Sequence, residues 1–438
     1  MTPIPGKENL KREIGVMALT LNILNITVGT GIFVIPAIIA EDLGATAILA
    51  YFVCGILIFL IALCFAEVGS KTTTSGGVYT YIETAFGPYA GFLANNIYWV
   101  GGCVFSDAAV ANALADTLKF IFPSLSTEVF RIVFFLFIFG GLALLNIRSV
   151  KNVVRFIELA TLGKLIPLIL LVIIGARFVS TENLKWVSTP TFSNIGSASL
   201  LLFLAFLGFE GPLSNGGEIK NAKRAVPLAV FFGISLVLVL YMSIQLVTQG
   251  VLGGTMPMHK DAPLAAVAGI AFGKAGAILI IIATILSMLG NIGGEILSIP
   301  RILFAGARDG LMPKSFAKVH SRFFTPYVAV IFYAALDFIF SVTGEFKVLA
   351  TLASASVLII YLGVSLATLK LRKKRDTDTE KTFRVAGGVI VPVLASCGII
   401  WLLSNLSKQE LTGIAIFIFV FSVVYLFIKM LKDKKWDS

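Results

Sequence analysis

The chain has 438 residues, of which 57% are hydrophobic and only 13% are charged. Soluble globular domains carry about 25% charged residues, so this composition excludes a soluble enzyme or binding protein. Apolar runs of about twenty residues, the length that crosses a bilayer as a helix, separate the charged clusters. This pattern predicts an all-α polytopic membrane protein and excludes a transmembrane β-barrel, whose strands are short and alternating.

Apolar runs bounded by charges, glycine or proline predict twelve transmembrane helices. In chain order the spans are 14–40, 45–68, 91–118, 128–147, 152–178, 194–217, 225–250, 273–303, 325–343, 346–369, 386–405 and 410–431. Residues 75–88 are too polar to span and too apolar for a solvated loop, so we expect an interfacial or re-entrant segment there.

The basic residues predict the orientation of the chain. With the N-terminus inside, 26 of the 35 Lys and Arg residues fall on the cytoplasmic side. Basic residues concentrate in cytoplasmic loops, so the tails 1–13 and 432–438 are expected in the cytoplasm, and the bilayer is expected to be the plasma membrane, in a bacterium the inner membrane. The same bias accounts for the net charge of +11, and no nucleic-acid partner is expected.

Metal, redox and catalytic sites have little support in the sequence. All four cysteines lie in apolar runs without paired spacing, and there are only two histidines. No pairing of histidine with serine, and no pair of histidines, falls near a membrane face. We therefore expect no metal, no cofactor and no enzyme activity.

Two of the spans contain matched interruptions. Span 1 is broken near 27–31 (TVGTG) and span 6 near 208–212 (GFEGP), and both breaks fall near the middle of the membrane. They lie five spans apart, so a second unit that repeats the first must enter from the opposite face. This is the inverted-repeat signature of secondary transporters. It predicts five-helix repeats at 14–180 and 194–370, followed by two C-terminal helices at 386–431.

Helix breaks within lipid leave backbone groups that need partners. The N–H groups of Thr30 and Gly31, at the start of the outer half of span 1, suit an α-carboxylate because the positive helix end lies behind them. Free carbonyls at the ends of the opposite half-helices suit an α-ammonium, and glycine lets a ligand reach the backbone. The carbonyls are those of Thr27, Leu204 and Leu207, and the glycines are Gly29, Gly31 and Gly208.

Three motifs resemble those of the amino acid–polyamine–organocation transporter superfamily. Residues 28–37 (VGTGIFVIPA) resemble its helix 1, residues 206–227 resemble its helix 6 break and following loop, and residues 308–313 (RDGLMP) resemble the cytoplasmic end of its helix 8. The resemblance covers nearly the whole chain. It implies a LeuT-type fold and sodium-independent transport of amino acids or their amine products, by proton symport or by antiport.

Lys164 is the least expected residue, since it lies about 18 Å into span 5, too deep to reach the interface easily. Such a cation must be paired, solvated or neutral. Proton-coupled and L-type-like members of the superfamily have a lysine where sodium binds in sodium-driven members. The resemblance therefore implies that Lys164 replaces the ion and ties helix 5 to the helix 1 break; a structural ion pair is the alternative.

Intramembrane carboxylates supply the remaining candidates. Glu210 belongs to the family motif and is expected to hold the helix 6 break or a water network. By the resemblance, Glu295 in helix 8 lies beside the substrate side chain, on one face with Ser287 and Asn291. Glu295 there would favour a cationic substrate; alternatively, it neutralises Lys164.

Further pocket residues follow from the resemblance. Ser106 and Asp107 align near the helix 3 pocket position, where Asp107 adds a negative charge or lines the pore without touching substrate. Leu204 stands where arginine–agmatine exchangers have a tryptophan, which argues against that substrate, and Phe206 could close over the site. Animal relatives of the L-type class bind a glycoprotein subunit through a cysteine between spans 3 and 4. Residues 119–127 contain none, so no disulfide-linked subunit is expected.

The sequence therefore predicts a secondary transporter that moves an L-amino acid by alternating access. The alternatives are a polyamine or amine antiporter or exporter of the same fold, a nutrient-sensing receptor and a channel.

Overall fold

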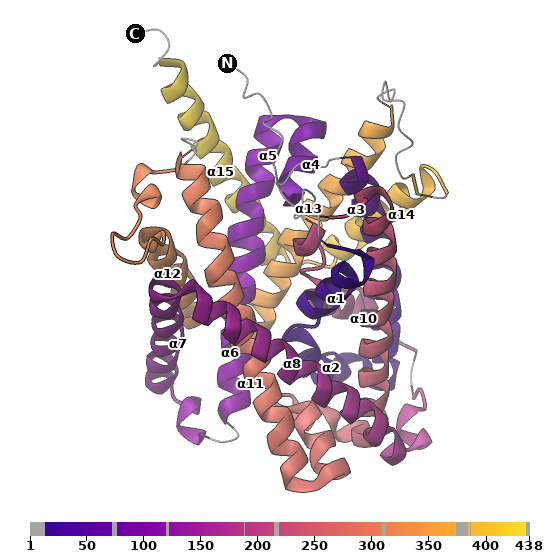
Figure 1. Ribbon diagram of the computed structural model, residues 1–438. Helices are drawn as coiled ribbons and strands as arrows, with labels where there is room; N and C mark the ends of the chain where they lie inside the picture. Colours follow the sequence, from indigo (N-terminus) through magenta and orange to yellow (C-terminus); the bar gives the residue numbers. More distant parts are fainter. Residues whose placement is uncertain are drawn as a thin grey trace.

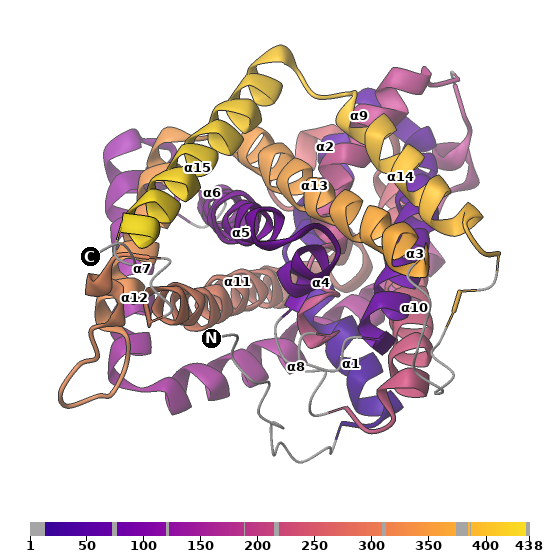
Figure 2. The same ribbon diagram turned by 90° about the horizontal axis from the view of Figure 1, so that it is seen from above.

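The computed structural model describes residues 14–71, 77–119, 122–187, 189–213, 219–308, 312–373, 384–385 and 387–434. The described residues form helices and no strand, apart from an isolated bridge between Ile14 and Ile219. Most of the long helices run along a common direction in Figure 1 and are seen from above in Figure 2. The two predicted tails, in large part, and half of the motif at 308–313 lie outside the described residues.

The first predicted span is two helices, α1 (Val16–Thr27) and α2 (Gly31–Leu43). Val28 leaves helical geometry at ψ 78°, so the helix is broken within the predicted segment 27–31. The first residue of α2, Gly31, is a glycine because no side chain would fit at this position. A Cβ there would lie 2.7 Å from the Cβ of Ala205. The break is therefore shaped by close packing between the two interrupted spans.

The next predicted spans are α3 (Ile48–Lys71) and a composite helix made of α5 (Pro88–Asn96), the π-helical η2 (Ile97–Val104) and α6 (Phe105–Lys119). Between them α4 (Gly77–Phe86) has ten residues, or about 15 Å of helix, too short to cross a bilayer. Gly87, at φ +94°, turns the chain sharply into α5.

The second break follows α7 (Glu128–Arg148), α8 (Val150–Gly175), α9 (Phe192–Leu202) and the 3₁₀ turn η6 (Phe203–Phe206). Leu207 is extended and Gly208 has φ +100°, a left-handed conformation that favours glycine. The chain thus stops being helical one residue before the predicted segment 208–212.

The second half contains α10 (Ala222–Leu252), η8 (Gly253–His259), α11 (Pro263–Arg308), α12 (Tyr327–Thr343), α13 (Phe346–Lys373), α14 (Ile390–Leu403) and α15 (Lys408–Lys434). Gly273, at φ +71°, divides α11 into two helices, and the predicted span 8 begins at this residue.

Eight helical stretches of the described chain are long and apolar enough to cross a membrane. The two broken spans, together with α12 and α14, give shorter apolar helices. Large apolar side chains on the outside, such as Phe137 on α7 and Phe419 on α15, are 76% and 69% exposed, as expected of a lipid-facing surface. The protein is a polytopic integral membrane protein.

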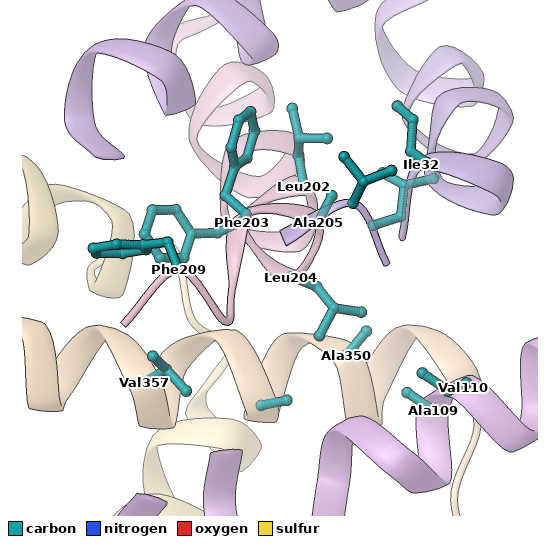
Figure 3. Close-up of a cluster of buried hydrophobic side chains, with 14 of the residues drawn as sticks. Ile32, Ala109, Val110, Leu202, Phe203, Leu204, Ala205, Phe209, Ala350 and Val357 are labelled. Atoms are coloured by element: carbon teal, nitrogen blue, oxygen red, sulfur yellow. The ribbon is translucent and has the colours of Figure 1, made fainter. Parts of the chain in front are cut away.

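The second break lies at the centre of the molecule. Figure 3 shows Leu202, Phe203, Leu204 and Ala205 between Ile32 of α2, Ala109 and Val110 of α6, and Ala350 and Val357 of α13. The helix α2 packs against α9 and η6, while α8 packs along α11 and α1 along α10. This packing holds both breaks against each other.

Candidate functional site

The two helix breaks are in direct contact. Gly31 packs against the backbone and side chain of Ala205, and a Cβ on Gly208 would come within 2.9 Å of the Ile26 side chain. These contacts within the protein favour glycine at both positions.

Tyr241 of α10 ties the two breaks together. Its buried hydroxyl lies 2.8 Å from the carbonyl oxygens of both Thr27 and Ala205 and can donate to either. The Gly29 N–H also donates to the Thr27 oxygen, at 2.7 Å. We expected the Thr27 carbonyl to be free, but in this conformation its oxygen accepts from the Gly29 N–H and lies within hydrogen-bond distance of the Tyr241 hydroxyl. The reason is that α10 packs against α1 and brings a hydroxyl to the break.

Glu210 forms hydrogen bonds within the second break and to a neighbouring helix. Its Oε2 accepts hydrogen bonds from the Gly208 N–H at 3.1 Å and from the Tyr361 hydroxyl of α13 at 2.6 Å. The carboxylate therefore satisfies a backbone donor released by the break and joins it to a neighbouring helix, the geometry of a residue that holds the break.

Lys164 reaches from α8 to the first break. Its Nζ donates a 2.8 Å hydrogen bond to the carbonyl oxygen of Asn25, two residues before the end of α1. The lysine is buried, and in the described part of the chain it makes no ion pair with Glu295. The Lys164 ammonium thus links α8, the predicted span 5, to α1.

A cavity of about 1070 Å³ lies beside the breaks. It extends to the end of the molecule where α4 and the C-terminal part of α15 lie, because Glu83 and Lys429 belong to its lining (Figure 2). Six of the residues singled out from the sequence also line it, namely Lys164, Gly208, Glu210, Ser287, Asn291 and Glu295.

Asn291 connects this cavity to the first break, since its Nδ2 would lie 3.6 Å from a Cβ placed on Gly29. The hydroxyls of Thr27, Thr30 and Ser287 are buried and have no hydrogen-bond partner, and Ser287 lines the cavity. The first N–H groups of α2 have no partner within the helix either. Buried polar groups are nearly always paired, so this cluster of unsatisfied groups has the character of a ligand site.

Glu295 lines the cavity, as does Glu210, and the Cys103 thiol lies nearby. Cys103 lies in the π-helical η2, and such segments occur frequently at functional sites. Among the described residues, Glu295 has no cationic partner.

The other residues singled out from the sequence do not themselves line the cavity. They are Thr27, Gly29, Thr30, Gly31, Ser106, Asp107, Leu204, Phe206 and Leu207. Most of them belong to the packed breaks themselves. Asp107 is fully buried and accepts a 3.1 Å hydrogen bond from Tyr333 of α12.

The sequence did not single out Tyr241, Tyr361 or Asn25. Both tyrosines lie in apolar runs with no motif around them. The position of each tyrosine in the middle of a predicted span could have indicated a role, since a buried tyrosine hydroxyl usually has a hydrogen-bond partner.

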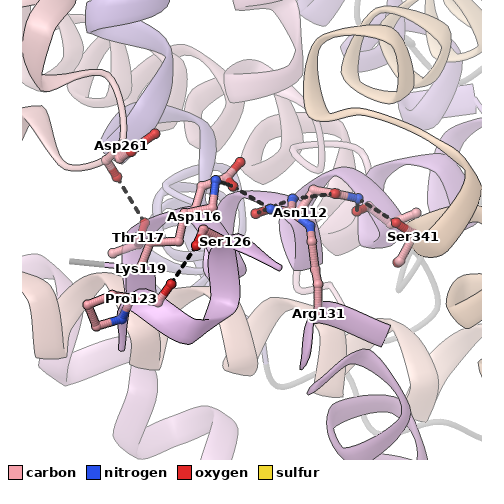
Figure 4. A network of polar contacts seen from close by, with 10 residues as sticks. Asn112, Asp116, Thr117, Lys119, Pro123, Ser126, Arg131, Asp261 and Ser341 are labelled. Atoms are coloured by element: carbon pink, nitrogen blue, oxygen red, sulfur yellow. Dashed lines mark hydrogen bonds and ion pairs between the residues drawn. The ribbon is translucent and has the colours of Figure 1, made fainter. Parts of the chain in front are cut away.

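The end of the molecule opposite α4 is closed by a polar network (Figure 4). Arg131 of α7 donates to Asp116 and to the side-chain oxygen of Asn112, both at 2.7 Å. Asn112 donates to the Ser341 carbonyl at 3.1 Å, and Thr117 donates to the Asp261 carbonyl at 3.1 Å. These bonds join α6 to α7, to α12 and to the loop before α11.

Known proteins match the chain over most of its length. A branched-chain amino acid permease of Bacillus subtilis (strain 168) is 26% identical over 96% of this chain and 93% of its own. A serine/threonine exchanger of the same organism is 28% identical over 90% and 91%. The large neutral amino acids transporter small subunit 2 of Mus musculus is 26% identical over 89% and 75%.

The amino acid permease family model matches residues 14–434. The resemblance to the amino acid–polyamine–organocation superfamily is thus confirmed. The chain belongs to the amino acid permease family, whose members are membrane transporters and not enzymes.

Proposed function

We propose that this protein is a secondary active transporter that moves L-amino acids across the plasma membrane by alternating access, without sodium. The observation that carries the proposal is the cluster of unsatisfied polar groups where the first break, Asn291 and the cavity meet. A zwitterion supplies both an acceptor and a donor to such a site.

The substrate α-carboxylate binds the N–H groups of Thr30 and Gly31 at the start of α2, where the helix dipole favours an anion. The α-ammonium binds carbonyls of the breaks, at Leu204, Leu207 and Thr27. Because Tyr241 and Gly29 occupy the Thr27 oxygen, ammonium binding there requires one of these bonds to be released. Phe206 and Ser106 complete the wall around the substrate, and the fully buried Asp107 lies behind it without touching the substrate.

Glu295 sets the preference for the substrate side chain. It faces the cavity without a cationic partner, which supports a role toward the substrate over one as the counter-ion of Lys164. A carboxylate there favours a side chain that carries a cation or a hydrogen-bond donor. Two relatives are named for branched-chain and for large neutral amino acids, which supports neutral amino acids as further substrates.

Lys164 takes the place of sodium as the positive charge that links α8 to the first break. Its ammonium already engages a backbone carbonyl oxygen near the break, the kind of ligand that binds a hard cation. Transport is then driven by protons or by exchange, and a relative named a serine/threonine exchanger supports the second mode.

Twelve transmembrane helices form a five-plus-five inverted repeat with two further helices, and both termini lie in the cytoplasm. The positive-inside distribution then places the end that carries α4 on the cytoplasmic side. The cavity reaches that end, while the network around Arg131 closes the other, so the conformation described is inward-facing.

A thermal-shift screen of the purified protein tests the substrate class. The probes are the twenty amino acids and common polyamines, each at two pH values, because a ligand that binds only the folded state raises the melting temperature. At about one hundred times its Kd, a true ligand stabilises by about 2.7 kcal/mol. Stabilisation by L-amino acids and not their D-enantiomers supports the proposal, and stabilisation by polyamines alone replaces it with amine transport.

A further inference from the structure

Asp107 and Asp337 form a buried acidic pair outside the substrate cavity. Asp107 lies in the first turn of α6 and Asp337 in the middle of α12, and both are 0% exposed. Tyr333, which donates to Asp107, lies one helical turn before Asp337 on α12, so both carboxyl groups lie at the contact between α6 and α12. Neither residue lines the cavity.

The pair has far fewer partners than buried carboxylates need. Asp107 Oδ2 accepts a hydrogen bond from Tyr333, but Asp107 Oδ1 has no partner. Both oxygens of Asp337 also have none. A carboxylate ionised in the membrane interior without a counter-charge is costly, and two in proximity cannot both be ionised.

The helices around the pair supply no cation to it. The titratable groups that face it are Tyr333 on α12, Cys103 on η2 and Glu295 on α11. From α7, Arg131 is already held by Asp116 and Asn112. The charged residues of α13 lie at its ends, Lys314 lies in the exposed turn η9 (Lys314–Ala317), and no described group of three or more acidic, cysteine or histidine residues could hold a metal.

Glu295 links this pair to the cavity. It lines the cavity, and its helix α11 packs against both α6 and α12, which carry the two aspartates. The three carboxyl groups therefore form a series from a water-accessible surface to a fully buried site between two helices.

We propose that Asp107 and Asp337 are a proton-binding site: the pair takes up one proton, exchanged with the cavity by way of Glu295, and releases it once per transport cycle. Protonation forms one O–H group on the pair and removes one negative charge between α6 and α12, so it changes how strongly these helices hold together. The proposal rests on the proposed transport function and adds the place where a proton is bound.

The test uses the full-length protein in proteoliposomes with a tritiated mixture of L-amino acids. Two assays run in parallel: exchange at equal pH on both sides, and accumulation driven by a gradient of one pH unit. One proton per substrate permits accumulation of about tenfold. The variants are Asp337→Asn and, as control, Glu345→Gln, an exposed carboxylate at the start of α13.

We expect wild type and Glu345→Gln to exchange and to accumulate, while Asp337→Asn exchanges without accumulating. Unchanged accumulation by Asp337→Asn, accumulation that requires sodium, or exchange without pH-driven accumulation in wild type would each overturn the proton site. Absence of exchange in wild type would instead overturn the transport function.

A second measurement covers the case in which Asp337→Asn fails to fold. Infrared difference spectra of wild type between about pH 5 and about pH 8 should contain the C=O band of a buried protonated carboxyl. That band should be weaker or shifted in Asp107→Asn, because one of the two interacting carboxyl groups is gone. Spectra without the band in wild type, or with an unchanged band in Asp107→Asn, would contradict the site.

Discussion

Lys164 and Asn25 join helices α8 and α1 by a single 2.8 Å hydrogen bond, from a buried ammonium to a backbone carbonyl oxygen beside the first break. Hydrogen bonds to charged groups contribute about 1.5 to 3 kcal/mol. Lys164→Met should therefore lower amino acid exchange at least about tenfold, since every 1.4 kcal/mol is a factor of ten, while the protein still inserts.

Lys185→Met is the matched control for this variant, because Lys185 pairs with Glu182 at a site where both side chains are more than two-thirds exposed. Exchange in proteoliposomes should be the same as in wild type. If Lys164→Met exchanged at the wild-type rate, the tether would have no part in transport.

Tyr241 supports a second prediction, on stability. Tyr241→Phe removes the hydroxyl that serves the carbonyls of Thr27 and Ala205, and should lower the free energy of unfolding by about 1 to 3 kcal/mol. Tyr51→Phe is the control, since the Tyr51 hydroxyl is equally buried but has no partner. Melting curves in one detergent compare the two, and equal losses would show that the hydroxyl of Tyr241 does not hold the breaks.

The network around Arg131 should keep the end opposite α4 closed. Arg131→Gln removes the bonds to Asp116 and Asn112 and should raise the labelling rate of a cysteine introduced by Ala113→Cys, which lines a smaller pocket there. We expect a severalfold increase with a membrane-impermeant thiol reagent. An unchanged rate would mean that apolar packing alone closes this end.

The carboxyl group of Asp261, in the loop before α11, should make the stability of the folded protein depend on pH. Burial, and then repulsion by Asp116, raise the pKa of the Asp261 carboxyl. A raised pKa means that the folded state binds the proton more tightly, so the stability that this group contributes is present at low pH and is lost as pH rises through the raised pKa. Asp261→Asn should therefore increase the melting temperature at neutral pH and leave it unchanged at the acidic end. A decrease at neutral pH would contradict a raised pKa at Asp261.

Much of the fold could be predicted from the sequence, because glycine pairs and apolar run lengths act locally. The breaks at 27–31 and near 208 follow from backbone chemistry alone, and Lys164 and Glu210 were conspicuous as charges within lipid. Tyr241 and Tyr333 could not be found this way, since their partners come from helices distant in the chain. Gly31 illustrates the same limit, because the contact that excludes a side chain there is with Ala205.

Binding of L-amino acids to Gly29→Ala tests most directly whether the substrate lies at the paired breaks. Gly31→Ala would be ambiguous, since its methyl overlaps Ala205, whereas a methyl on Gly29 lies an ordinary 3.6 Å from Asn291. The control is Gly140→Ala, where the new methyl meets nothing within 4 Å. With the substrate at the breaks, Gly29→Ala keeps the wild-type melting temperature but loses the thermal shift given by L-amino acids, and Gly140→Ala retains it. An undiminished ligand shift in Gly29→Ala would place the substrate elsewhere.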